Sequence, residues 1–286
     1  MKIGILIYVK GLIDTMKILK FKTGDKIPGV GFGTYKLTGS EGIKAIENAL
    51  EVGYRHIDTA EGYNNQPEVS KAIKNSGLSR RELFITSKVG YDNLHYDNLI
   101  QACEETLQEL KTDYLDLYLI HWPNKMISVE ETLRAMGKLK SDGKIKNIGV
   151  SNFTIKRLEE VKGITDEEVV LNQVEFHPYL YQKELYEYCN DNNISLAAYS
   201  PIARGGVFGD PVIAEIGKKY YKNEAQVTLK WMIQKDIIVI PRSSNAAHIK
   251  ANFDIFDFEL NNDEIYRIDN IDKQERLIDP DWGEFN

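Results

Sequence analysis

The chain has 286 residues, of which 42% are hydrophobic and 28% charged, and its formal net charge is −7 at pH 7. An acidic, well-solvated surface of this kind repels nucleic acid and anionic lipid, so we expect neither as a partner. The length allows one large domain or two small ones, because barrels of roughly 250 residues fold as single domains.

The chain begins with a short apolar stretch, and a second possible start methionine follows it. The run from Ile3 to Val9 is far shorter than the roughly 20 residues that span a membrane, and no small-residue cleavage site follows it. Met16 opens the second credible beginning, so residues 1–15 are interpreted as an upstream extension and residues 16–286 as one domain. After Met16 the pattern predicts a short β-hairpin that turns at Gly24–Asp25 and closes the bottom of the domain.

From Ile27 onward, short apolar or β-branched runs alternate with stretches of helical periodicity. This alternation predicts a parallel sheet with crossover helices. Eight runs favour a closed (β/α)8 barrel over an open sheet, which more often has about five to seven strands and a Gly-rich phosphate loop after the first. The runs cover residues 29–33, 55–59, 83–87, 115–120, 146–150, 170–174, 194–198 and 237–240.

The intervals between these runs have the pattern of amphipathic helices. Ser40 is the expected N-cap of the first helix, and Gly53 is expected to end it. The clearest further helices, with apolar residues three and four apart and charge opposite, cover residues 97–110, 129–139 and 225–234.

Barrel enzymes carry their chemistry at the carboxyl ends of the strands. In this sequence a charged or polar residue follows nearly every predicted strand: Asp58, Lys88, His121, Ser151–Asn152, Gln173 with Glu175, Tyr199–Ser200 and Arg242. Tyr63 follows Asp58 in the next loop. We therefore expect these side chains to meet at one mouth of the barrel.

Four of these residues have complementary chemistry, namely Asp58, Tyr63, Lys88 and His121. A tyrosine hydroxyl is a weak acid, with a reference pKa of about 10, and a neighbouring lysine cation favours its phenolate form. A carboxylate would keep that lysine charged, and a histidine would hydrogen-bond the substrate oxygen. The set suits protonation of an alkoxide formed by hydride attack, and the hydride must come from a cofactor. Taken singly, each residue also fits a structural role such as a rim ion pair.

Five separated segments resemble the aldo-keto reductase family: Gly53–Tyr63, Ile85–Lys88, Leu119–Pro123, Ile148–Asn152 and Ile238–Asn245. The resemblance runs from about Leu19 to the end of the chain and is to the compact microbial members, similar to aldose reductase and 2,5-diketo-gluconate reductase. It implies NAD(P)H-dependent reduction of aldehydes, ketones, keto acids or sugar-derived carbonyls to alcohols. It also implies that Tyr63 is the general acid, that Lys88 and Asp58 lower its pKa, and that His121 orients the carbonyl.

The same resemblance implies a binding site for the nicotinamide cofactor. Its carboxamide would meet Ser151, Asn152 and Gln173, and its ring would stack on Tyr199. The pyrophosphate would lie along Ser200, Pro201, Ile202 and Gly205. The remaining expected cofactor residues are Gly33, Thr34, Arg242, Ser243, Ser244, Asn245, His248 and Asn252.

The adenosine 2′-phosphate end departs from the family pattern. An arginine fork at Arg242 suits a phosphate dianion and favours NADPH. The family usually has arginine where His248 stands and glutamate where Ala251 stands. Histidine is mostly neutral at pH 7, so we expect NADPH as the cofactor with NADH usable.

The substrate pocket is expected to be lined by Tyr35, Trp122 and His121, with Tyr91 and Trp282 as additions from a loop and the tail. The loop after Pro123 is short, which predicts an open pocket for a small aldehyde, keto acid or sugar-derived carbonyl. The physiological substrate is left open.

Two other functions account for part of the pattern. A hydrolytic barrel would use Asp58 and Glu175 as an acid–base pair, but it leaves Lys88, Tyr63 and Arg242 without a role. A non-catalytic, cofactor-binding regulatory or structural member of the fold would not need all four of the complementary residues.

The remaining expectations concern the chain's surroundings. Cys103 and Cys189 lack metal-ligand spacing and are predicted to be inert thiols in a reducing, cytoplasmic compartment. The resemblance to compact members suggests a monomer or a weak homodimer. No metal is expected, because no two histidines stand at ligand spacing on a predicted helix among His56, His95, His121, His177 and His248.

Overall fold

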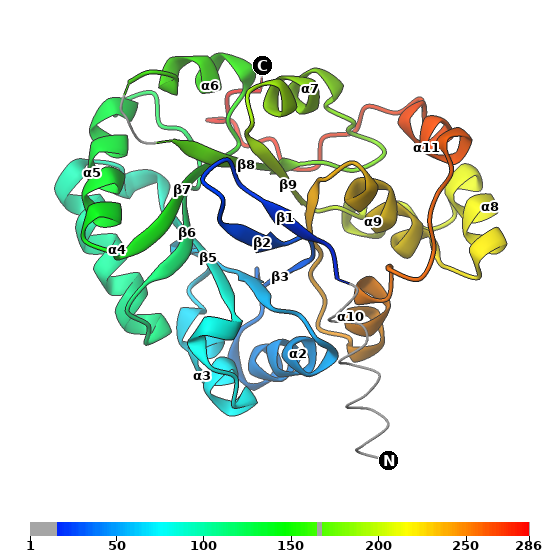
Figure 1. Cartoon of the computed structure of the whole chain (residues 1–286), viewed down its shortest axis with the longest axis horizontal. Coiled ribbons are helices and arrows are strands. Elements are labelled where there is room, and N and C mark those ends of the chain that lie inside the picture. The colour runs from blue at the N-terminus through cyan, green and yellow to red at the C-terminus, as the bar shows by residue number, and fades with distance from the viewer. Residues whose placement is uncertain (1–15, 165–167, 286) are drawn as a thin grey trace.

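A computed structural model describes residues 16–164 and 168–285 of the chain (Figure 1). Eight parallel strands form one sheet in the order β10-β9-β8-β7-β6-β5-β4-β3. The first and last strands meet through a parallel bridge between Val30 and Val239 and a 3.0 Å hydrogen bond from Gly33 N to Pro241 O, so the sheet closes. The predicted (β/α)8 barrel is therefore confirmed.

The strands lie close to where the sequence pattern placed them. They are buried on both faces, as expected of a sheet that is filled inside and covered by helices outside. Their bounds are β3 Gly31–Gly33, β4 His56–Asp58, β5 Phe84–Val89, β6 Leu115–Ile120, β7 Ile145–Ser151, β8 Val169–Glu175, β9 Ser195–Tyr199 and β10 Ile238–Ile240.

A two-stranded hairpin closes one end of the barrel. Strands β1 (Ile18–Lys20) and β2 (Lys26–Pro28) pair antiparallel, and Figure 1 shows them lying across the barrel. Gly24 has φ 91°, which the turn requires and which glycine adopts without strain. The expected turn is confirmed; the expected extension, residues 1–15, lies outside the described residues.

Helices surround the barrel and cover the outer face of the sheet (Figure 1). Apolar side chains between the two layers form the larger core, and a second cluster that includes Phe21 and Ile27 of the hairpin fills the barrel interior. The helices are α2 Gly39–Val52, α3 Gln66–Ser76, α4 Tyr96–Leu110, α5 Val129–Ser141, α6 Ile155–Val161, α7 Lys183–Asp191, α8 Pro211–Tyr220, α9 Glu224–Gln234, α10 Ala246–Phe253 and α11 Asn262–Asp269.

The expected N-cap of the first of these helices was wrong. Thr38, rather than Ser40, is the N-cap of α2, because the first helical hydrogen bond runs from Gly42 N to Thr38 O at 3.1 Å. Gly53 ends the helix as expected, with φ 126°.

Both cysteines are free and buried, Cys103 on α4 and Cys189 on α7. Burial raises the pKa of each thiol to about 12, so neither is a thiolate near neutral pH. Among the described helices, none combines the length and apolar character needed to cross a membrane.

Candidate active site

Three side chains at strand ends form a buried polar network. Lys88 Nζ lies 2.6 Å from Asp58 Oδ1 and 2.8 Å from Thr59 O. Gln173 Nε2 donates to Asp58 Oδ2 at 2.7 Å. The Lys88 side chain is 0% exposed and that of Asp58 3%. A buried charge pair persists only when its remaining polar atoms are satisfied, and here both carboxylate oxygens of Asp58 have a donor.

Tyr63 lies against this network. It ends the short 3-10 helix η1 (Glu61–Tyr63), is half-buried, and places its Oη 3.4 Å from Lys88 Nζ. Its ring is 5.6 Å from the His121 ring and 5.1 Å from the Tyr35 ring, measured between centroids. The structure thus brings together Asp58, Tyr63, Lys88 and His121, as the sequence predicted.

The pKa shifts of Tyr63 and Lys88 agree only in part with the sequence-based expectation. Burial raises the pKa of Tyr63, and the Lys88 cation opposes that rise without cancelling it. The net direction is opposite to the expected lowering, although Lys88 acts with the expected sign. Burial works against the Lys88 charge, but Asp58 and Tyr63 together hold the Lys88 pKa above its usual value.

The His121 imidazole is neutral. Burial, followed by the neighbouring Lys88 charge, lowers its pKa to about 3. A neutral imidazole beside a lysine cation and a tyrosine hydroxyl can donate a hydrogen bond to a carbonyl oxygen, while the cation stabilises negative charge that develops nearby.

The residues expected at a nicotinamide carboxamide lie beside this group. Asn152 donates from Nδ2 to His121 O at 3.0 Å and accepts at Oδ1 from Tyr199 Oη at 2.7 Å. Ser151 Oγ donates to Gln173 O at 2.8 Å. Gln173 is held through its Nε2, and its Oε1 is an acceptor of the kind that fits an amide N–H. Tyr199, fixed through its hydroxyl, presents the aromatic ring that a flat heterocycle needs.

The loop expected at the pyrophosphate has an unusual backbone. Ser200, Ala203, Arg204 and Gly205 all have positive φ, at 49°, 47°, 52° and 94°. Left-handed residues turn successive N–H groups toward one side of a loop and form concavities for anions. Pro201 and Ile202 belong to the same loop, of which Pro201 is buried and Ile202 half-buried.

Two expected cofactor residues support the barrel. Thr34 is buried, and both its N and its Oγ1 donate to Asp58 O at 3.0 Å. A Cβ on Gly33 would lie 3.2 Å from Ile240 Cγ2, so glycine allows close packing there. Thr34 thus holds the strand end that carries Asp58, and Gly33 allows β3 to lie close to Ile240 of β10.

The expected 2′-phosphate residues lie together at the end of β10 and the start of α10. Arg242 is exposed and donates from Nε to Tyr35 O at 3.0 Å and from Nη2 to Lys36 O at 3.1 Å. Asn245 Oδ1 caps α10 by accepting from Ala247 N and His248 N. Ser243 is half-buried, Ser244 and His248 are exposed, and Asn252 is buried.

Aromatic side chains from a loop and the tail gather at the mouth. The Trp282 ring lies 5.0 Å from that of Trp122 and 4.8 Å from that of Tyr91. Phe285 adds a contact at 5.6 Å from Trp122. Tyr91 and Trp282 therefore join Trp122, as expected.

Glu175 fixes the tail that carries Trp282 and Phe285, a role the sequence did not reveal. Its Oε1 accepts from Leu277 N at 2.7 Å and its Oε2 from Ile278 N at 2.8 Å. His177 Nε2 lies 2.9 Å from the same Oε1. This buried carboxylate is fully engaged, so the hydrolytic alternative, which needs Glu175 as an acid or base, has no support.

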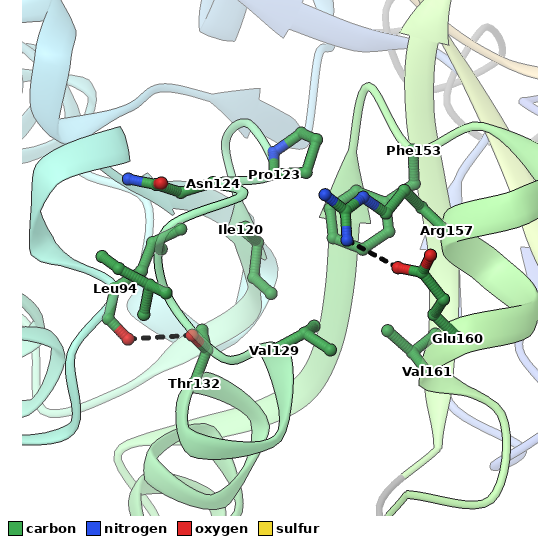
Figure 2. A pocket seen from close by; sticks show the side chains of 11 residues that line it. Leu94, Ile120, Pro123, Asn124, Val129, Thr132, Phe153, Arg157, Glu160 and Val161 are labelled. Carbon is green, nitrogen blue, oxygen red and sulfur yellow. Dashed lines mark hydrogen bonds and ion pairs between the residues drawn. The ribbon is translucent and has the colours of Figure 1, made fainter. Parts of the chain in front are cut away.

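A small cavity is lined by Pro123 and Asn124, the residues that follow Trp122. Figure 2 shows it between the segment with Asn124 and Thr132 and the segment with Phe153 and Arg157. Its volume of about 10 Å³ is room for one water molecule. It is a packing void and not a substrate pocket. Among the described residues, no cluster of three or more His, Cys, Asp or Glu side chains could hold a metal ion.

An eight-stranded barrel with a buried Asp–Lys pair, a tyrosine and a neutral histidine at its strand ends defines a class of carbonyl-reducing oxidoreductases. The model of the aldo/keto reductase family matches residues 29–273, and the chain belongs to this family. It is therefore an enzyme that reduces carbonyl groups with a nicotinamide cofactor, and the non-catalytic alternative has no support.

Similar proteins cover nearly the whole chain. A glyoxal reductase of Bacillus subtilis is 44% identical over 267 residues, which cover 93% of this chain and 95% of the relative. A methylglyoxal reductase, DkgA, of Escherichia coli is 40% identical, covering 92% and 97%. Among solved structures, the aldose reductase of Schistosoma japonicum aligns with a TM-score of 0.88 at 33% identity, covering 92% and 94%. An aldo-keto reductase complexed with NADPH, AKR2E5, aligns at 0.87 and 30%, covering 93% and 90%.

Proposed function

We propose that this enzyme reduces small aldehydes, including 2-oxoaldehydes such as glyoxal and methylglyoxal, with Tyr63 as the proton donor and NADPH as the preferred cofactor. The observation that carries the proposal is the contact of Tyr63 Oη with Lys88 Nζ at 3.4 Å, with Lys88 buried and paired to Asp58. A phenol that must release a proton needs a fixed positive charge nearby.

Each side chain of the group has a distinct task in this proposal. When bound, the cofactor supplies hydride to the carbonyl carbon. Tyr63 donates its proton to the carbonyl oxygen, and Lys88 stabilises the phenolate that remains. Asp58 keeps Lys88 charged, because the carboxylate supplies the counter-ion that a buried lysine cation needs. Neutral His121 donates a hydrogen bond that orients the carbonyl.

The substrate class rests on the mouth of the site and on the relatives. Trp122 and Trp282 narrow the mouth with flat apolar faces that suit a small uncharged carbonyl compound. Two of the most similar proteins are named as reductases of glyoxal and methylglyoxal. A panel of aldehydes and keto acids, followed by loss of reduced-nicotinamide absorbance, would rank the substrates, and the lowest KM for charged keto acids would contradict the proposal.

The cofactor preference rests on Arg242. Its Nη1 is uncommitted to the carbonyls of Tyr35 and Lys36, so it can meet a phosphate. A histidine at position 248 lacks the permanent charge of the arginine usual there, which makes the preference modest. His248→Arg should tighten NADPH about tenfold more than NADH in fluorescence titrations. Equal tightening of both cofactors would mean that this position does not meet the 2′-phosphate.

The role of Tyr63 is tested by Tyr63→Phe. This variant should lose turnover while its NADPH dissociation constant stays within about twofold. Tyr221→Phe is the matched control, because Tyr221 is 97% exposed and far from the group in the chain. Retention of a tenth or more of the wild-type rate in Tyr63→Phe would remove Tyr63 from the acid role. We also propose that the enzyme acts in the cytoplasm. We propose further that it is a monomer or weak dimer, and analytical sedimentation would measure this oligomeric state.

A further inference from the structure

A carboxylate outside the catalytic group fixes the turn that carries Tyr63. Glu61 opens η1, and its Oε2 accepts a hydrogen bond from Gly90 N at 2.7 Å. Its Oε1 accepts from Asn93 Nδ2 at 2.5 Å. Gly90 directly follows β5, the strand that bears Lys88. One side chain therefore ties the turn of Tyr63 to the strand end of Lys88.

Gly90 makes room for this carboxylate. A Cβ placed on Gly90 would lie 3.2 Å from each carboxylate oxygen of Glu61 and 3.3 Å from its Cδ. Such contacts are closer than ordinary van der Waals separations. The backbone at Gly90 has φ −66°, an angle that alanine adopts freely. The missing side chain at Gly90 therefore serves the fit of the Glu61 carboxylate and not a special backbone conformation.

Glu61 joins η1 itself to the loop after β5, whereas the chain on either side of the turn is held by other bonds, from Lys88 Nζ to Thr59 O at 2.8 Å and from Asn65 Nδ2 to Thr34 O at 2.7 Å. The local hydrogen bonds of the turn are Tyr63 N to Ala60 O and Asn64 N to Glu61 O, both at 3.1 Å. A single 3-10 turn has poor hydrogen-bond geometry and is weak alone. Tyr63 Oη is already 3.4 Å from Lys88 Nζ, so a small outward displacement breaks this contact.

We propose that Glu61 is a positioning residue, which sets the distance between Tyr63 Oη and Lys88 Nζ by clamping η1 onto the loop after β5. This inference rests on the proposed role of Tyr63 as the proton donor. Misplacement of a reacting group by about 1 Å can lower a rate 100-fold, so loss of the clamp acts on the chemical step and spares cofactor binding.

Glu61→Ala is the first test. The single-turnover rate of NADPH oxidation should fall about tenfold, with KM and the NADPH dissociation constant within about twofold. Glu61→Gln should restore most of the rate, because its amide oxygen accepts from Gly90 N and the Asn93 amide can turn its oxygen toward the new NH₂. Amide exchange at Tyr63 and Asn64 should be faster in Glu61→Ala and near wild type in Glu61→Gln, a readout independent of activity.

Glu131→Ala is the matched control. Glu131 likewise accepts from a backbone N–H, that of Tyr96 at 2.9 Å, but this bond ties α5 to the start of α4 and not to η1. Its single-turnover rate should equal that of the wild type. A tenfold loss in this variant would show that any such carboxylate matters, which would overturn the specific role of Glu61.

Gly90→Ala provides a coupling test. The added methyl group should displace the Glu61 carboxylate and lower the rate in the wild-type background, yet change nothing further in Glu61→Ala. Additive losses would overturn the clamp, as would a Glu61→Ala rate within twofold of wild type. If Tyr63→Phe is inactive and Glu61→Ala is fully active, only the clamp is wrong; if Tyr63→Phe is active, the proposed function fails first.

Discussion

Replacing Asp58 by asparagine removes one charge from the buried network and leaves its shape intact. Lys88 Nζ is 2.6 Å from the Asp58 carboxylate, and the Lys88 side chain is 0% exposed. The asparagine oxygen still accepts a hydrogen bond from Lys88, but the lysine charge then lies in the protein without a counter-ion. Gln173 Nε2, which donates to Asp58 Oδ2, faces an amide NH₂ in one of the two amide orientations.

Breaking a buried ion pair by removing one partner costs about 3–5 kcal/mol. The lower end applies here, about 3 kcal/mol, because one hydrogen bond to Lys88 survives. For a chain of this size each kcal/mol corresponds to roughly 2 °C in Tm, so the melting temperature of Asp58→Asn should fall by roughly 6 °C.

The loss of unfolding free energy in Asp58→Asn should depend on pH. The pKa of Lys88 is held above its usual value in the folded wild type. A raised lysine pKa contributes stability that is complete below the unfolded value of about 10.4 and is lost as the pH rises through the folded value. The difference in unfolding free energy between wild type and Asp58→Asn should therefore be full at pH 7 and shrink above about pH 10.

Urea unfolding followed by tryptophan fluorescence measures this difference. Asp142→Asn is the control, because its pair with Lys138 is solvent-exposed and such pairs contribute at most about 1 kcal/mol. The double variant Asp58→Asn/Lys88→Met, which removes both charges, should recover much of the lost stability. If the unfolding free energy falls by less than about 1 kcal/mol in Asp58→Asn, or if the two substitutions are strictly additive, the loss is not caused by a buried Lys88 charge without a counter-ion.

Three further predictions concern other features of the chain. Glu175→Gln should release the tail, seen as a red shift of Trp282 fluorescence and a higher KM, because an amide cannot accept from both Leu277 N and Ile278 N; unchanged spectra would contradict this. With the pKa of His121 near 3, His121 should contribute no inflection to the rate between pH 5 and 8, and an inflection near pH 6.5 that vanishes in His121→Asn would contradict it. Cys103 and Cys189 should not react with a thiol reagent until the chain unfolds, since burial keeps them protonated; rapid labelling of the folded chain would show otherwise.

The barrel and the catalytic group were predictable because their geometry follows from strand register. Parallel strands of a barrel end at one mouth, so a polar residue at the end of each run is placed without knowledge of distant contacts. The pairing of Gly33 with Asp58 and of Lys88 with Leu119 shows how closely the strands align. The five segments that resemble the aldo-keto reductase family contain these same residues, Asp58, Tyr63, Lys88 and His121.

The features that the sequence did not reveal depend on contacts between residues far apart in the chain, or on opposing effects on a pKa. Glu61 meets Gly90 across 29 positions and Glu175 meets Leu277 across 102, and no local pattern reports such pairs. The net pKa of Tyr63 is decided by burial against the Lys88 charge, and burial was not known beforehand.

Three helices begin at residues whose type marks a helix start in the sequence. Asp210, Asn245 and Asn261 each accept backbone hydrogen bonds at the start of a helix, at α8, α10 and α11. Asn and Asp are strong N-cap residues, so these three helices, which were not predicted individually, had readable starts. Asn245, expected at the cofactor, also caps α10 with its side chain.

The buried network and the aromatic mouth come from different parts of the chain. Asp58 and Lys88 sit on strands, while Trp122 and Trp282 lie in a loop and the tail. For directed evolution this separation is useful, because saturation libraries at the two tryptophans vary the shape of the entrance and leave the charge pair untouched. Loops on a rigid scaffold tolerate such change far better than its core does. New carbonyl specificities are therefore best sought at the entrance, with the strand ends held constant.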